Sequence, residues 1–454
     1  MNKILVFIFL LVVFLFLPTT NYPLLTAHAI VDPLEAPNNK FGVHIISATP
    51  GELSAASEMV NFNGDWGYVT FLIESKNRDQ YKWQQFFNEL RRQHLIPIVR
   101  IATKPVNSHW ERPYEGEEKA WADFLDSLNW PTKNRYVVIY NEPNHAKEWG
   151  NFVDPKSYAI VLNKTITALK EKNQDFFVLN CGFDSSAPHQ PPEYYDEERF
   201  LREMDEEIPG IFNRLDGWVS HPYPNPNFSG SPDSFGRGTV RGYLWEISLL
   251  RDIGLHKNLP IFITETGWKH QEGLKTDPNL LNAEETSVYY RKAYEEAWNS
   301  DQIVAVTPFL LNYQEEPFDH FSFKKITGEV QNDKILPAGR QVLGVQFPEY
   351  YPQYTVLRQM PKVSGQPLQD IKAEFVSYDG SKVTFKNTGQ SIWGERGEVK
   401  IAPFEPFRIP VGTRIEPNQE YIHNLSQDNP KVTTTITPNF LTELFENIKA
   451  FLGG

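Results

Sequence analysis

Two glutamates in this sequence stand at positions that suit carboxyl chemistry. Glu142 comes directly after the apolar run Tyr136–Tyr140, within the string Asn-Glu-Pro-Asn. Glu265 comes directly after the run Pro260–Thr264, within the string Thr-Glu-Thr-Gly-Trp. Two neighbouring carboxyl groups can divide acid–base and nucleophilic work when one stays protonated while the other is ionised. The two glutamates are therefore the first candidates for catalytic residues.

The segments that carry these glutamates belong to a series of eight short apolar runs. The runs are nearly continuous in apolar character, which is typical of parallel strands covered on both faces, and amphipathic helical stretches separate them. The expected strands are Phe41–Ile46, Tyr68–Ile73, Ile96–Ala102, Tyr136–Tyr140, Phe176–Cys181, Gly217–Ser220, Pro260–Thr264 and Val304–Leu311.

This alternation predicts an α/β fold with a (β/α)8 TIM barrel over residues 40–345. A doubly wound open sheet would alternate in the same way, but the count of eight favours the barrel. Active sites of such barrels gather at the carboxyl ends of the strands. Glu142 follows the fourth strand and Glu265 the seventh, so we expect their side chains to face each other across the barrel mouth.

The hydrolysis of a glycosidic bond uses such a pair, because one carboxyl group protonates the leaving oxygen while the other attacks the sugar or activates water. The triplet Asn141-Glu142-Pro143 resembles the acid/base motif of the clan A glycoside hydrolases, and the segment Thr264–Trp268 resembles their nucleophile motif. The resemblance covers about residues 40–345. It implies a retaining double displacement with Glu265 as nucleophile, Glu142 as acid and then base, and Asn141 as donor to the sugar 2-hydroxyl.

Further site residues are expected around this pair. His221 and Tyr223 resemble the residues that line the site after the sixth strand of this clan, with Tyr223 the better candidate to hydrogen-bond the nucleophile. We also expect sugar contacts from four side chains near strand ends, although each of these also fits a core or rim position; the four are His44, Arg100, Trp268 and Asn312. Many clan relatives carry a tryptophan at the end of the eighth strand, whereas residues 307–313 of this chain contain none.

Several other classes of site are not indicated by the sequence. The histidines form no His-x-x-x-His pattern and Cys181 is the only cysteine, so we expect no metal site and no disulfide within the chain. There is no glycine-rich phosphate loop, and we expect no cofactor. The net charge of −13 and the lack of a Lys/Arg cluster argue against a nucleic-acid partner. A carbohydrate substrate is the expected partner.

The hydrophobic pattern of the sequence changes after residue 345. Short runs of period two, separated by turn signals such as Asp379-Gly380, predict a small β-sandwich domain over residues 346–436. Residues 437–454 show helical amphipathicity and predict a terminal helix. Docking of this helix on the body is the simplest expectation, and the alternatives are a membrane surface or another chain.

The first 29 residues have the pattern of a signal peptide. Lys3 precedes an apolar run, Ile4–Leu17, which is short for a membrane span, and Ala27-His28-Ala29 fits a cleavage site. The alternative is an uncleaved N-terminal anchor. In either case we expect the body of the protein, as a monomer, to be secreted or held at the cell surface.

The leading hypothesis is therefore a retaining glycosidase that cleaves β-glycosidic bonds in a polysaccharide or oligosaccharide. A second hypothesis is a catalytically inactive surface carbohydrate-binding protein on a barrel scaffold. A third is a structural cell-envelope protein, since a barrel fold alone does not specify catalysis. The presence of both glutamates favours the enzyme.

Overall fold

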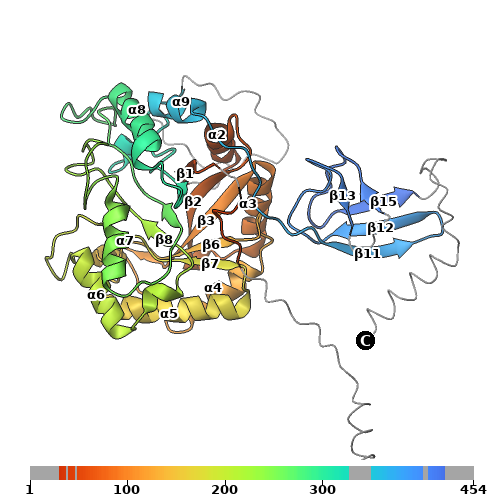
Figure 1. Ribbon diagram of the computed structural model, residues 1–454, viewed down its shortest axis with the longest axis horizontal. Helices are drawn as coiled ribbons and strands as arrows, with labels where there is room; N and C mark the ends of the chain where they lie inside the picture. Colours follow the sequence, from red (N-terminus) through yellow and green to blue (C-terminus); the bar gives the residue numbers. More distant parts are fainter. Residues whose placement is uncertain (1–29, 37–38, 47–48, 327–348, 402–406, 425–454) are drawn as a thin grey trace, which may run out of the picture. The chain divides into compact units, whose positions relative to one another are not determined.

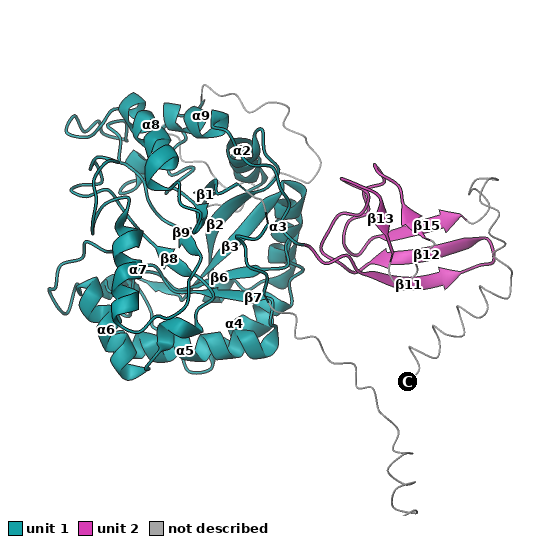
Figure 2. Cartoon of the chain, in the orientation of Figure 1, with its two compact units in different colours: residues 1–368 teal, residues 369–454 magenta. Residues whose placement is uncertain are grey.

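The computed structural model describes residues 30–36, 39–46, 49–326, 349–401 and 407–424. The chain divides into two compact units, residues 1–368 and 369–454 (Figure 2). The predicted signal peptide and the predicted C-terminal helix both lie outside the described residues. Among the helices that the structure describes, none combines the length and the apolar character needed to cross a membrane.

Unit 1 is built on two parallel sheets. The larger has five strands in the order β1-β2-β3-β6-β7, and the smaller has three in the order β10-β9-β8. Each of the eight apolar runs predicted from the sequence overlaps one of these strands. The strands are β1 (Gly42–His44), β2 (Gly67–Glu74), β3 (Leu95–Ala102), β6 (Arg135–Ile139), β7 (Phe176–Leu179), β8 (Trp218–Ser220), β9 (Ile261–Ile263) and β10 (Ile303–Val306).

Single parallel bridges link the two sheets at both of their edges. Leu179 of β7 bridges to Gly217, just before β8, and Phe41, just before β1, bridges to Val306 of β10. One cluster of buried side chains also draws on both sheets, with members such as Tyr136, Phe177 and Phe262. The residues between these members in the sequence face the helices instead, which is the alternation expected of strands buried on both faces.

Helices lie around the strands of unit 1 (Figure 1). Local side-chain contacts fix where they begin: Asp154, for example, accepts a hydrogen bond from the Ser157 backbone at 3.0 Å, and Pro155 occupies the first turn of that helix. The helices are α2 (Pro50–Asn61), α3 (Gln80–Arg92), α4 (Glu117–Asp126), α5 (Pro155–Lys172), α6 (Glu197–Glu207), α7 (Gly242–Asp252), α8 (Ala283–Lys292) and α9 (Pro352–Gln359).

The division between the units falls after Leu368 and not after residue 345, where the sequence placed it. The reason is helix α9, which packs against α8 and α2 of unit 1. Tyr354 of α9 is fully buried, and its hydroxyl donates to the backbone oxygen of Ala55 in α2 at 2.9 Å. Helix α9 thus belongs to unit 1.

Unit 2 is a small antiparallel β unit with a core of its own. Its three-stranded sheet has the order β11 (Ala373–Tyr378), β12 (Lys382–Asn387), β15 (Glu420–Asn424), and a second pair joins β13 (Val399–Lys400) to β14 (Arg408–Ile409). The core gathers apolar side chains from both groups of strands and the segments between them: Val383, Phe385, Trp393, Ile401, Phe407 and Ile409.

Candidate active site

The two glutamates singled out in the sequence meet at the carboxyl ends of the parallel strands. Glu142 follows β6 and Glu265 follows β9, and a carboxyl oxygen of each lies within 4.8 Å of one from the other. Both open into a cleft of about 550 Å³. Because the strands are parallel, their carboxyl ends bring together residues far apart in the sequence.

Glu265 is held by hydrogen-bond donors on both of its oxygens. The Tyr223 hydroxyl donates to Oε2 at 3.1 Å, and the Arg100 guanidinium donates to Oε1. The ring of His44 lies behind, with Nδ1 3.8 Å from Oε1. Burial of Glu265 opposes its ionisation, but His221, Arg100 and His44 together outweigh burial and lower the pKa to about 2. Glu265 is therefore a carboxylate throughout the neutral range, as a nucleophile requires.

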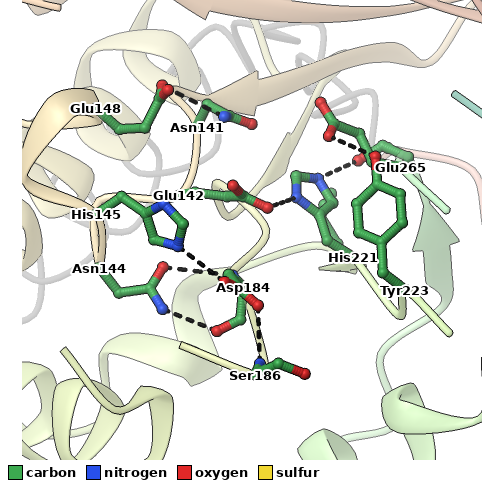
Figure 3. A network of polar contacts seen from close by, with 12 residues as sticks. Asn141, Glu142, Asn144, His145, Glu148, Asp184, Ser186, His221, Tyr223 and Glu265 are labelled. Atoms are coloured by element: carbon green, nitrogen blue, oxygen red, sulfur yellow. Dashed lines mark hydrogen bonds and ion pairs between the residues drawn. The ribbon is translucent and has the colours of Figure 1, made fainter. Parts of the chain in front are cut away.

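Glu142 is oriented by His221. Nδ1 of His221 lies 2.8 Å from Glu142 Oε1 (Figure 3). Its Nε2 lies 3.0 Å from the hydroxyl of Thr264. Burial disfavours the charged imidazole, but the charges of Glu265 and Glu142 outweigh burial and raise the pKa of His221. Gly182 makes room for this ring, because a Cβ at that position would lie 2.4 Å from Nε2.

Asn141, between the end of β6 and Glu142, links two charged groups around the cleft. Its Oδ1 accepts from Arg100 at 2.8 Å, and its Nδ2 donates to Glu148 Oε2 at 3.3 Å. The residues on either side have left-handed backbone conformations, with φ of 66° at Tyr140 and 31° at Glu142. Such conformations cost about 1–3 kcal/mol each outside glycine and are concentrated at functional sites.

Glu142, His221 and Glu265 are also the group among the described residues whose donor atoms could approach a metal ion, since all lie within 4.8 Å of one another. The sequence predicted no metal here. The raised pKa of His221 favours a protonated ring, and both nitrogens of a protonated imidazole are donors that cannot bind a cation.

The structure brings most of the predicted site residues together, though not all in the cleft wall. Arg100, Asn141, Glu142, Tyr223 and Glu265 line the cleft. The hydrogen bond from Tyr223 to the nucleophile candidate is the one that the sequence predicted.

The two predicted histidines require a correction, because both are buried behind the carboxyl groups. His221 is 1% exposed and His44 is 0% exposed, so neither ring presents a surface to a sugar. Burial, followed by the charge of Arg100, lowers the pKa of His44 to about 3, and its ring stays neutral. Their contacts are with the carboxyl groups of Glu142 and Glu265.

Two further residues with predicted sugar contacts do not line the cleft. Trp268 is 1% exposed, packs edge-on against Tyr290, and donates its indole N–H to the backbone of Gly230 at 2.7 Å, so it is a core residue and not a stacking platform. Asn312 donates to Glu52 at 2.9 Å and does not line the cleft. Both residues follow strand ends, but packing and not sequence position decides whether a side chain there reaches the opening.

Sequence reasoning missed several residues of the cleft. Glu148, His145 and Asp184 line one wall, with His145 Nε2 2.9 Å from Asp184 Oδ2 (Figure 3). The signal for the first two was their place shortly after Glu142, and the signal for Asp184 was its place shortly after β7. The chain after β10 contributes an aromatic wall in the region where the sequence lacks a tryptophan: Phe309, Tyr313, Phe318 and Phe321.

Comparisons with known proteins give structural similarities only. No protein-family model matches this sequence, and no curated protein matches it either. Solved structures similar to this chain include glycoside hydrolases of the class that the sequence resembles.

A glucosidase from Croceicoccus marinus is 10% identical, with 85% of this chain and 83% of that chain covered and a TM-score of 0.48. A GH5_18 protein from Bifidobacterium longum subsp. infantis is 11% identical, with 74% and 81% covered and a TM-score of 0.47. A GH128 (subgroup II) endo-beta-1,3-glucanase from Sorangium cellulosum is 13% identical, with 65% and 95% covered and a TM-score of 0.42.

Proposed function

We propose that this protein is a retaining glycoside hydrolase that cleaves β-glycosidic bonds in a polysaccharide or oligosaccharide. The observation that carries the proposal is the meeting of Glu142 and Glu265 in one cleft, with carboxyl oxygens within 4.8 Å. Retaining glycosidases hold their two carboxyl groups about 5–5.5 Å apart, whereas inverting enzymes need about 6.5–9.5 Å to admit a water molecule. The short separation supports the retaining mechanism.

The surroundings of the two carboxyl groups suggest their roles. Glu265, kept anionic by His221 and Arg100, is the nucleophile that attacks the anomeric carbon. Glu142 donates a proton to the leaving oxygen as the glycosyl-enzyme forms, and in the second step removes a proton from the attacking water. The hydrogen bond from the Tyr223 hydroxyl orients Glu265 for the attack and weakens as the carboxylate loses its charge.

The proposal includes a closed eight-stranded barrel as the scaffold. The parallel bridges Leu179–Gly217 and Phe41–Val306 support closure, because they join the two sheets at both edges. A cluster of inner side chains shared by both sheets supports it as well. For unit 2, the two antiparallel groups of strands around one core are consistent with the predicted sandwich.

The proposal also includes secretion or display at the cell surface, and a carbohydrate substrate for a monomeric enzyme. Secretion rests on the charged start, the apolar run and the Ala-His-Ala string of residues 1–29. A β-linked glycan outside the cell is then the substrate class that the enzyme meets.

The test is hydrolysis of a panel of aryl β-glycosides and β-linked polysaccharides by the wild type, by Glu142→Ala and by Glu265→Ala. We expect both variants to lose several orders of magnitude in kcat, because each removes a group that acts in the transition state. Azide should restore product formation in both: a glycosyl azide of inverted anomeric configuration with Glu265→Ala, and of retained configuration with Glu142→Ala.

Two results would count against the proposal. Products of inverted configuration from the wild type would replace the retaining mechanism with a single displacement. Binding of glycans without hydrolysis, unaffected by either substitution, would favour the inactive carbohydrate-binding protein instead.

A further inference from the structure

A third carboxyl group faces the cleft and takes no part in the mechanism described above. Glu148 lies in the short 3-10 turn Ala146–Glu148, shortly after Glu142, and lines the cleft. Its Oε2 accepts a hydrogen bond from Asn141 Nδ2 at 3.3 Å (Figure 3). This contact joins the third carboxyl group to a residue that stands directly beside the acid/base candidate.

The amide of Asn141 is held from both ends. Arg100 Nη1 donates to its Oδ1 at 2.8 Å, and the same nitrogen also donates to Glu265 Oε1. A guanidinium can only donate and a carboxylate can only accept, so these two neighbours fix which end of the amide is oxygen and which is nitrogen. One N–H of Asn141 is used by Glu148, and the second is left for a ligand.

We propose that Glu148 is a positioning residue, which holds the Asn141 amide so that its second N–H donates to a hydroxyl of the sugar bound at Glu265. This inference rests on the proposed function. The connected groups run from Glu148 through Asn141 and Arg100 to the nucleophile. Hydrogen bonds to hydroxyls near the anomeric carbon strengthen in the transition state of glycoside hydrolysis, so the position of this donor affects kcat more than KM.

The electrostatics of Glu148 agree with this role. Burial first, and then the charge of Glu142, raise the pKa of Glu148 to about 7, with Glu265 adding in the same direction. Arg100 and the hydrogen bond from Asn141 act in the opposite direction. Glu148 therefore gains its charge as the pH rises through the neutral range, and the charged carboxylate is the stronger acceptor for the Asn141 amide.

A double-mutant cycle on the full chain tests the inference, with an aryl β-glycoside that the wild type cleaves. We expect Glu148→Leu to lower kcat by about 10- to 100-fold while KM changes less than about threefold, since it removes one hydrogen bond to a charged acceptor. Glu148→Gln should recover most of the loss, because its side-chain oxygen still accepts from Asn141. The double variant Asn141→Ala/Glu148→Leu should be no slower than Asn141→Ala alone, as for two residues that act as a unit.

A compensating pair keeps the inference falsifiable if Glu148→Leu does not fold. Asn141→Asp places a carboxylate against Glu148 and should be slower than Asn141→Ala. Adding Glu148→Gln to Asn141→Asp should restore part of the rate, because the Gln amide can donate to the new carboxylate. Glu111→Leu, an exposed acidic residue outside the cleft, is the control for loss of charge.

Additive losses in the cycle, or a Gln variant as slow as Leu, would overturn the inference. A readout independent of turnover separates this failure from failure of the proposed function. In 15N-asparagine-labelled protein, the side-chain amide signals of Asn141 should shift with a midpoint near pH 7 in the wild type and lose this shift in Glu148→Gln. Asn141 amide signals with the same pH dependence in the wild type and in Glu148→Gln would overturn the positioning role, even where hydrolysis is intact.

Discussion

Burial and charge act in opposite directions on the Glu265 carboxyl group. Burial alone would favour its protonated form, and the cationic groups His221 and Arg100 reverse that preference. The pKa of about 2 is thus a property of the neighbours and not of the glutamate itself. A change in one neighbour should move the acid side of the pH–rate profile.

Arg100→Met tests this balance. Burial raises the pKa of Glu265 and the Arg100 guanidinium lowers it. Without the guanidinium this pKa rises, so Glu265 becomes protonated at a higher pH than in the wild type. We expect the acid limb of the kcat/KM profile, measured from about pH 3 to about pH 8, to shift to higher pH. The plateau value of kcat/KM should also fall. Arg112→Met, which breaks an ion pair with Asp154 away from the cleft, should leave the limb in place. Coincident acid limbs in wild type and Arg100→Met would contradict this account.

Tyr223→Phe removes a single hydrogen bond to Glu265, the proposed nucleophile. The bond joins a neutral donor to a charged acceptor, an interaction worth about 1.5–3 kcal/mol, so we expect kcat/KM to fall by about 10- to 100-fold. Tyr354→Phe provides a matched control, since it deletes a buried tyrosine hydroxyl, bonded at 2.9 Å, that does not line the cleft. Stability should fall in the control while the rate per folded molecule stays constant; equal rate losses in both variants would refute the role of Tyr223.

At the scale of elements, the segment after β7 and the segment after β8 come close together where Gly182 meets the ring of His221. Gly182 follows β7 with φ of 69°, and a Cβ there would lie 2.4 Å from His221 Nε2. His221 follows β8 and contacts Glu142 at 2.8 Å. The ring of His221 therefore positions Glu142, the acid/base candidate, and this ring fits only because residue 182 has no side chain.

Gly182→Ala should displace His221 and with it Glu142. We expect kcat/KM to fall by at least about tenfold, in addition to a backbone cost of about 1–2 kcal/mol in stability. Gly116→Ala is the matched control, since Gly116 has φ of 89° but no atom within 4 Å of the position that a Cβ would take. Thermal unfolding measures the backbone strain in both variants, and activity measures the displacement of His221, which we expect only in Gly182→Ala. Similar activity losses in the two variants would rule out that displacement.

The sequence predicts the strands and the polar residues that follow them well, because both are visible in short local patterns. The eight apolar runs and the two glutamates are visible without any knowledge of contacts, and β10 ends earlier than predicted because the chain after Val306 leaves the sheet to form the aromatic wall. Which way a side chain points after the strand is set by packing, so Trp268 lies in the core and Asn312 contacts Glu52, and neither lines the cleft. Glu148 was missed because its importance lies in a contact with Asn141.

At the scale of the whole molecule, a pair of buried carboxyl groups makes stability depend on pH. Glu246 of α7 and Glu197 of α6 are both 0% exposed, and Glu246 accepts a hydrogen bond from the Trp218 indole at 2.7 Å. Burial raises the pKa of Glu246 to about 7, and burial together with the charge of Glu246 raises that of Glu197. Both groups are held as acids inside unit 1 at low pH.

Glu246→Gln should remove part of this dependence. An unfolded glutamate has a pKa of about 4.3, so between that pH and about 7 the folded wild type retains a proton that the unfolded chain releases, and stability falls as the pH rises. The contribution from Glu246 reaches about 4 kcal/mol, since the two pKa values differ by about 2.7 units and each unit corresponds to about 1.4 kcal/mol. Urea unfolding at about pH 5 and about pH 8 measures it: the difference between the two pH values should shrink in Glu246→Gln and persist in the exposed control Asp252→Asn. An unchanged difference would contradict the prediction.

A hairpin at the rim of the cleft ties two loops together. Trp110, in the hairpin of β4 (Pro105–Val106) and β5 (His109–Trp110), accepts a backbone hydrogen bond from Gly150 at 2.8 Å, which fastens the loop after β3 to the loop after β6. The first loop carries neither glutamate, and in the second Glu142 stands next to the strand, well before Gly150. Insertions or deletions around the hairpin can therefore change the shape of the cleft entrance while Glu142 and Glu265 keep their places. Under the proposed function, a change in this hairpin alters which glycans enter the cleft and leaves the reaction itself unchanged.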